Sequence, residues 1–280
     1  MLAAKILLCF ILACVPAYIW GYIFYKKQPE PRRWVALTFI AGILSVVPIM
    51  IYKFSWEFLP KLNVFLYTDN MDHDLLGFSN LVYLPVGVVL AFMFVGVLEE
   101  YMKNIVVRKT DRKHLSSIDD AIEFCIIAAL GFAFVENMMY FFYIWNYQGF
   151  DSLFISFIFR SIFSTFAHIL FSGIYGYYYG VAHFATPIWQ EEIQQNRHPI
   201  LRLMHRILHL KGSTLFKEEK MMEGLLLAMG LHAFFNVALE VGWTFIIVPY
   251  LVIGYLLLSH LFNKKENHKR YNHFIKVPLT

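Results

Sequence analysis

Two adjacent carboxylates, Glu99 and Glu100, follow a long apolar run that begins at Leu81, and Lys103 comes one helical turn later. On a helix, Glu99 and Lys103 share a face, and Glu100 and Lys103 nearly do. A carboxylate beside an ammonium group can stay charged in a poor solvent. Because neighbouring side chains point about 100° apart around a helix, one carboxylate could act on a substrate while the other orients a partner. The alternative is a helix end whose charges reach the membrane surface.

Three other apolar segments also carry polar groups near their middles. A charge at the centre of a membrane helix costs about 2.5–3.5 kcal/mol on insertion scales, so such groups are candidates for a functional site. Taken singly, a buried acid can be protonated and a lone histidine can be an ordinary core residue. Their recurrence on four segments favours a catalytic or transport site. The groups are Glu136 with Asn137, Arg160 with His168, and His232 with Asn236.

Metal binding is one chemistry that this set of residues allows. His168, His232 and one of Glu99 or Glu100 could bind zinc, whose usual ligands are imidazole nitrogens and carboxylate oxygens. The sequence has no H-E-x-x-H spacing, however. A carboxylate that activates water needs no metal, so we expect a site without a cofactor and keep zinc as the alternative.

The composition predicts an all-α membrane protein. Of the 280 residues, 59% are hydrophobic and 16% are charged, whereas soluble domains carry about 25% charged residues. Apolar runs near or above the ~20 residues that cross a bilayer indicate a single transmembrane domain, 1–280, with about seven spans. We expect the motifs to lie in a core of residues 81–240. The spans are roughly 2–25, 34–53, 81–103, 119–146, 152–182, 221–240 and 243–262.

Basic residues predict how the chain is oriented. They cluster after the first, third, fifth and seventh spans, and the intervening loops are poor in them. By the positive-inside rule, the N-terminus should lie outside and the C-terminus in the cytoplasm, as in a bacterial-type cytoplasmic membrane. The net charge of +4 therefore reports topology, and no nucleic-acid partner is expected. Within the cytoplasmic segment 190–220, residues 200–209 resemble a basic amphipathic helix, which either lies on an anionic leaflet or packs on the bundle.

Several polar or small residues have simpler structural interpretations. Ser117 and Asp120 are spaced as a helix-capping pair. Gly173, Gly176 and Gly180 would allow close contact between helices. The three cysteines lie in apolar stretches and are expected to be small buried residues.

Taken together, the polar motifs resemble those of a known family. The order is Glu-Glu-x-x-Lys at Glu99, Gly-Phe-x-Phe-x-x-Glu-Asn ending at Asn137, a histidine at His168, and His-x-x-x-Asn from His232. Over about residues 95 to 240 this order is similar to that of the PrsW intramembrane proteases, relatives of the CAAX prenyl endopeptidases and bacteriocin-immunity proteases. Lys103 stands where the wider superfamily usually has Arg, which favours the PrsW branch.

The resemblance implies an intramembrane endopeptidase acting on a membrane-anchored protein, such as an anti-sigma-factor-like regulator. One of Glu99 and Glu100 would be the general base, and His168 would share the water or orient the base. His232 and Asn236 would stabilise the oxyanion. Supporting electrostatic roles would fall to Lys103, Glu136, Asn137 and Arg160.

The helix positions also predict where the site lies. We expect one aqueous cavity lined by the third to sixth spans, with the other spans at the periphery. Arg160 and Glu136 would pair with each other, away from the substrate. A proton-coupled transporter is the main competing function, since buried Glu and His also relay protons, but no inverted repeat is visible in the sequence. A receptor or scaffold would leave the clustered ionisable groups unexplained.

Overall fold

The computed structural model describes residues 2–27, 32–75, 83–194 and 212–264. These residues form an all-α bundle, in agreement with the expected fold class, and their only extended pairing is an isolated bridge between Asp74 and Pro85. The elements in chain order are α1 (Leu2–Lys27), α2 (Arg32–Leu44), α3 (Val47–Ser55), the 3-10 turn η1 (Pro60–Leu62), α4 (Phe65–Thr68), α5 (Val86–Thr110), α6 (Ile118–Tyr147), α7 (Phe150–Phe159), the π-helical turn η2 (Arg160–Ser164), α8 (Thr165–His183), α9 (Ala185–Gln194), α11 (Gly212–Glu240) and α12 (Thr244–Phe262).

Five of the described helical segments are long and apolar enough to cross a membrane. They correspond to the first, second, fifth, sixth and seventh expected spans. Helices α5 and α6, where the third and fourth spans were expected, are also long, but they carry several charged residues. The five segments are 2–24, 32–55, 150–183, 212–240 and 244–262.

Helix α11 differs from expectation because it begins at Gly212, well before residue 221. Its first turns are polar but helical, and Lys220 pairs with Glu223 one turn later at 2.6 Å. Such pairs stabilise an exposed helix. The end of the expected cytoplasmic segment 190–220 is therefore part of this helix. The basic stretch at 200–209 lies outside the described residues.

Helix α6 is the centre of the bundle. Every residue from Ile118 to Phe134 is buried, and the helix packs against α1, α2 and α8. At its start, the Ser117 side chain accepts from the backbone of Asp120 and the Asp120 side chain accepts from that of Ser117. This confirms the predicted cap. Because α6 is buried and capped, it holds its own polar residues, Glu136 and Asn137, in fixed positions within the bundle.

Glycines set the closest helix crossings. A Cβ atom on Gly42 of α2 would overlap the carbonyl oxygen of Ala128, and one on Gly131 of α6 would overlap that of Phe39. The two backbones therefore touch at this crossing. On the other side of α6, a Cβ on Gly176 of α8 would lie 2.7 Å from the Cα of Ile122. The close contact that the α8 glycines predicted is confirmed.

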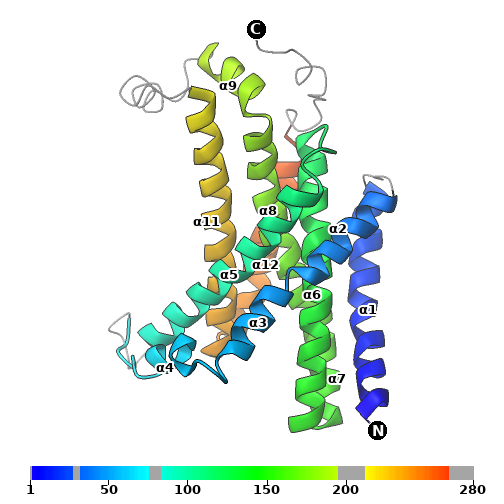
Figure 1. The fold of residues 1–280 in the computed structure, drawn as a ribbon, viewed down its shortest axis with the longest axis vertical. Helices are drawn as coiled ribbons and strands as arrows, with labels where there is room; N and C mark the ends of the chain where they lie inside the picture. The colour runs from blue at the N-terminus through cyan, green and yellow to red at the C-terminus, as the bar shows by residue number, and fades with distance from the viewer. Residues whose placement is uncertain (1, 28–31, 76–82, 195–211, 265–280) are drawn as a thin grey trace.

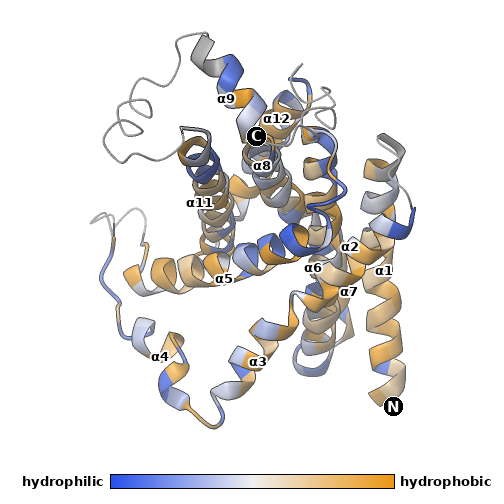
Figure 2. Cartoon of the chain, turned by 45° about the horizontal axis from the view of Figure 1, so that its top comes forward, coloured by the Kyte–Doolittle hydropathy of each residue, from blue (hydrophilic) through white to orange (hydrophobic). Residues whose placement is uncertain are grey.

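Helix α5 runs obliquely across the bundle, whereas α1, α6 and α11 are closer to parallel (Figure 1). Hydrophobic residues cover most of α1, and the end of α5 near Thr110 is hydrophilic (Figure 2). The exposed large side chains of α1 are apolar or aromatic, including Ile11 and Ile19. Such a surface suits contact with lipid.

Candidate active site

Helix α5 carries a buried ion pair. Lys103 Nζ lies 2.7 Å from Glu100 Oε1, and the two side chains are 3% and 2% exposed. The ammonium group also lies over the ring of Phe132, 4.3 Å from its centroid. The sequence placed Lys103 on the face of Glu99, but its carboxylate partner is Glu100. Three residues of separation, rather than four, bring these two side chains together.

His232 connects α11 to both glutamates. Its Nδ1 lies 2.8 Å from Glu100 Oε1, and its Nε2 lies 3.5 Å from Glu99 Oε2. The first distance is a hydrogen bond, whereas the second is too long for one. Glu99 Oε2 has no hydrogen-bond partner. This approach depends on Gly96, where a Cβ would lie 3.0 Å from the carbonyl oxygen of Met229 on α11.

His168 of α8 has a partner at each ring nitrogen. Its Nδ1 lies 3.0 Å from Lys103 Nζ and its Nε2 lies 2.8 Å from Glu136 Oε2. An ammonium group only donates hydrogen bonds. With Lys103 charged, Nδ1 must therefore accept, and the proton of a neutral His168 lies on Nε2, facing Glu136. The His168 and His232 rings are perpendicular, with centroids 5.1 Å apart.

Glu136 and Arg160 form the second ion pair of the site. The Arg160 guanidinium donates to Glu136 Oε2 at 2.7 Å and to Asn137 Oδ1 at 2.8 Å, and it lies over the ring of Tyr140. Asn137 in turn donates to the Thr165 hydroxyl, which donates to the carbonyl oxygen of Arg160. The expected pairing of Glu136 with Arg160 is present.

The π-helical turn explains the position of Arg160. Residues 160–164 wind more widely than an α-helix, and the Thr165 hydroxyl bonds the Arg160 carbonyl five residues earlier. Turns of this kind occur frequently at functional sites. As a result, Arg160 and His168, from the same helical segment, both reach Glu136 Oε2.

A cavity of about 420 Å³ brings these groups together. Its lining includes Glu99, His168 and His232, and also Glu136, Arg160 and Asn236. The Asn236 side chain makes no hydrogen bond to any residue of the described chain. Glu100 and Lys103 are buried behind the wall and do not line it. The described structure thus brings all the sequence-predicted residues into one neighbourhood, with six of them at the cavity.

Two details of the expected cavity are wrong. The second span is not peripheral, because Val46, Ile49, Met50 and Lys53, at the start of α3 and along it, line the cavity together with Phe65 of α4. The kink between α2 and α3 brings this stretch over the site. Arg160 and Glu136 also line the cavity and are not set apart from it, because the π-helical turn directs Arg160 toward α6.

Three of the cavity residues could hold a metal ion. Glu99, His168 and His232 each offer one ligand atom, and these atoms lie within 4.8 Å of one another. The residues come from α5, α8 and α11, so no local spacing could have indicated the group. A carboxylate with two imidazoles is a donor set that zinc enzymes use.

Sequence reasoning did not select some residues that shape the site. Thr165 of α8 hydrogen-bonds to Asn137. Ser172 of the same helix hydrogen-bonds to Glu100 at 3.4 Å. Phe132 lies against Lys103, and Tyr140 against Arg160. Small hydroxyls and aromatic rings are common in membrane helices and carry no signal alone. Only their spacing of three to five residues from His168, Glu136 or Arg160 could have indicated them.

Comparisons with known proteins identify the family of the chain. Residues 30–261 match the family model described as PrsW family intramembrane metalloprotease. The chain belongs to the PrsW family. The resemblance of the motifs is therefore confirmed, and the membership identifies the chain as a membrane-embedded hydrolase of the protease class. It does not favour the proton-coupled transporter.

Curated relatives carry the same family name. The chain is 27% identical to "Protease PrsW" of Oceanobacillus iheyensis over 83% of its own length and 84% of that protein. It is 30% identical to "Protease PrsW" of Clostridioides difficile over 60% of its length and 63% of that protein. The corresponding values for Geobacillus kaustophilus are 29%, 58% and 61%. No solved structure matches the chain.

Proposed function

We propose that this PrsW family member is an endopeptidase that hydrolyses a peptide bond of a membrane-anchored protein, with Glu99 activating the attacking water. The proposal rests on the surroundings of the Glu99 carboxylate. Its carboxylate lines the cavity, one of its oxygens has no hydrogen-bond partner, and His232 Nε2 lies 3.5 Å from that oxygen. A water molecule on the cavity side that donates one hydrogen bond to each group would satisfy both.

Glu100 has a different role in this proposal. Its carboxylate is occupied by Lys103 and by His232 Nδ1, and its side chain is only 2% exposed. A hydrogen bond from Nδ1–H to Glu100 leaves the Nε2 lone pair directed toward Glu99. Glu100 is therefore a positioning residue, which fixes the tautomer and orientation of His232.

The proposed reaction uses the cavity residues in sequence. Glu99 takes a proton from the water as its oxygen attacks the carbonyl carbon of the scissile peptide bond. The unpaired Asn236 amide donates to the oxyanion that forms, a kind of stabilisation often worth 10²–10³-fold in rate. As the C–N bond breaks, Glu99 returns the proton to the leaving nitrogen. The products are a new carboxyl group and a new amine.

The charges of the site favour Glu99 as the proton acceptor. Three carboxylates, Glu99, Glu100 and Glu136, face two fixed cations, Lys103 and Arg160. With both imidazoles neutral, the cluster has one excess negative charge. In a medium of low dielectric constant, charge is costly. Protonation of Glu99 during the reaction brings the cluster to neutrality.

The same residues accommodate a metal ion only in part. A cation at Glu99, His168 and His232 would supply Lewis-acid chemistry and lower the pKa of a bound water. His168, however, already has Lys103 and Glu136 at its two nitrogens, so a cation would have to replace one of them. A dication would also give the cluster a net positive charge. We therefore propose the glutamate mechanism without a metal.

The lining of the cavity supports entry of the substrate from the outer side. It extends from Glu99 to Lys53 and Glu240, near the ends of α3 and α11, and these helix ends lie toward the same end of the bundle as the N-terminus (Figure 1). With α5 and α6 counted as spans, the chain crosses the membrane seven times, with the N-terminus outside. The substrate would then be cut near the outer side.

A reporter fusion tests this topology. A reporter fused after residue 280 should be cytoplasmic, and one inserted near residue 70 should be external, because the Lys/Arg-rich loops alternate along the sequence. Both reporters on the same side would contradict the seven-span arrangement.

Cleavage in a defined system tests the activity. The purified chain is reconstituted in liposomes with a set of single-span membrane proteins, and the products are identified by mass spectrometry. We expect cleavage by the wild type at a defined bond and none above background with Glu99→Gln. Equal cleavage by the two proteins, with the fold retained, would refute the role of Glu99.

A further inference from the structure

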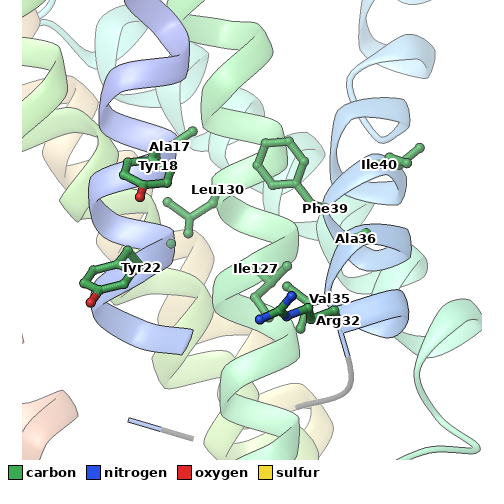
Figure 3. A pocket seen from close by; sticks show the side chains of 11 residues that line it. Ala17, Tyr18, Tyr22, Arg32, Val35, Ala36, Phe39, Ile40, Ile127 and Leu130 are labelled. Atoms are coloured by element: carbon green, nitrogen blue, oxygen red, sulfur yellow. The ribbon is translucent and has the colours of Figure 1, made fainter. Parts of the chain in front are cut away.

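An apolar groove lies on the opposite side of α6 from α8 and α11. Helices α1 and α2 form its walls, and Ile127 and Leu130 of α6 form its floor (Figure 3). Its volume of about 530 Å³ is within the usual range of small-molecule sites, roughly 300–1,000 Å³. The groove contributes nothing to the cavity at Glu99, because the two share no lining residue.

The groove is open because small residues line it. A Cβ on Gly21 of α1 would only reach ordinary contact distance, 3.8 Å, from Leu130, and Ala17 and Ala36 complete the walls. In a bilayer such a groove is filled by hydrocarbon. A transmembrane helix about 10 Å across and 30 Å long occupies roughly 2,000 Å³, so the groove fits an acyl chain better than a whole helix.

One end of the groove carries a positive charge. The guanidinium of Arg32 lies beside Ile127 and Val35 (Figure 3), and no carboxylate in the described chain pairs with it. Arg32 is also the first residue of a membrane-spanning segment. It therefore lies near the depth of the lipid headgroups, where an anionic phosphate can reach it.

Tyr22 of α1 lies near the end of the first apolar span, and Tyr18 lies about one turn deeper. Tyr18 and Tyr22 border the groove with stacked rings, centroids 6.3 Å apart, and they are 73% and 56% exposed. Tyrosine favours the membrane interface because its ring is apolar and its hydroxyl is polar. Unlike Arg32, the neighbouring Arg33 does not line the groove, and its guanidinium lies over the ring of Trp34.

We propose that this groove is a binding site for one anionic phospholipid, with an acyl chain between α1 and α2 and the headgroup phosphate at Arg32. The charge complementarity at Arg32 distinguishes this site from the general contact of apolar helices with lipid. The bound lipid would fill the gap between α1 and α2. The proposal is independent of the proteolytic mechanism.

Native mass spectrometry of the full chain in mild detergent tests the proposal. The probes are dioleoyl phosphatidylglycerol and, as the zwitterionic comparison, dioleoyl phosphatidylcholine. We expect one phosphatidylglycerol per chain to be retained preferentially. Arg32→Gln should weaken the binding of phosphatidylglycerol about fivefold, because one basic residue near an anionic lipid contributes about 1 kcal/mol. It should also remove the preference for phosphatidylglycerol over phosphatidylcholine. Arg33→Gln, the matched control, should change binding less than twofold.

A second pair of variants tests the groove itself. Gly21→Leu should fill it and reduce retention of phosphatidylglycerol at least tenfold, whereas Gly21→Ala should have little effect. Equal losses from Arg32→Gln and Arg33→Gln, or undiminished retention by Gly21→Leu, would overturn the proposal. So would a wild-type dimer that Gly21→Leu converts to a monomer, because the groove would then hold a second copy of the chain.

Discussion

Glu99 and Glu100 are neighbours in the chain, but they lie in different surroundings. Glu100 is enclosed by Lys103 and His232 and is 2% exposed. Glu99 faces the cavity, its side chain is 12% exposed, and one oxygen lacks a hydrogen-bond partner. The difference teaches that adjacent residues of α5 have separate roles. The buried Glu100 carboxylate holds Lys103 and His232 in place, whereas the Glu99 carboxylate faces the cavity and can react. Substitutions should therefore separate effects on stability from effects on chemistry.

Glu99→Gln should show the largest effect. Loss of a general base lowers the rate by about 10²–10⁴-fold, and the amide keeps the shape of the carboxylate. We expect the thermal unfolding midpoint in detergent to change little while cleavage nearly disappears. Glu100→Gln is the matched comparison, since it should lower the midpoint by leaving Lys103 unpaired. If the two variants behaved alike in both assays, the distinction between the carboxylates would be wrong.

Asn236→Ala tests the proposed oxyanion donor, which α11 contributes to the cavity. Removal of one oxyanion donor costs about 10²–10³-fold in kcat, and Asn236 supports no other side chain. Steady-state kinetics should show a fall in kcat with KM nearly unchanged. Leu239→Ala, which also alters the cavity lining, is the control and should leave kcat within a few fold. An equal fall in both would mean that cavity shape, and not the amide, matters.

Lys103→Met tests the buried ion pair between Lys103 and Glu100. Removing one partner of a buried ion pair destabilises a protein by about 3–5 kcal/mol, because the other charge stays unpaired. Unfolding in mixed micelles, followed by circular dichroism, should show this loss, and Lys103→Met combined with Glu100→Gln should recover part of it. Lys220→Met breaks a more exposed pair of the same spacing, Lys220–Glu223, and should cost less than about 1 kcal/mol. Equal costs for the two single variants would contradict the buried role of Lys103.

Chelation should have the smallest effect. Both nitrogens of His168 are engaged within the protein, so we expect activity to persist after dialysis against a strong chelator. Elemental analysis should then find far less than one metal ion per chain. A stoichiometric metal, lost together with activity and restored with it, would instead make Glu99, His168 and His232 ligands.

The sequence was sufficient to predict an all-α fold, the approximate positions of its long helices, and most of the polar residues that meet. Long apolar runs specify membrane helices, and polar groups inside them are costly enough to need one another. That reasoning placed Glu99, His168, His232 and Asn236 around one cavity, but it set Glu136 and Arg160 apart from that cavity, which they in fact line. Their catalytic roles remain predictions.

The partners within that neighbourhood were harder to predict. Whether Lys103 pairs with Glu99 or Glu100 depends on side-chain conformation and on the position of α8, which no helical spacing encodes. The π-helical turn at Arg160 likewise follows from tertiary contacts, through Thr165 and Asn137. The cavity wall formed by α3 depends on a kink between two helices that the sequence presents as one apolar run.

The crossing of α2 and α6 restricts which sequences this fold can accept. Gly42 and Gly131 each face a backbone carbonyl of the other helix, so even alanine at either position would force the helices apart. Gly131 lies less than two turns before Glu136, and any displacement of α6 would therefore carry the carboxylate away from His168. In a library of all single substitutions, both positions should tolerate no other residue, although neither touches the substrate cavity.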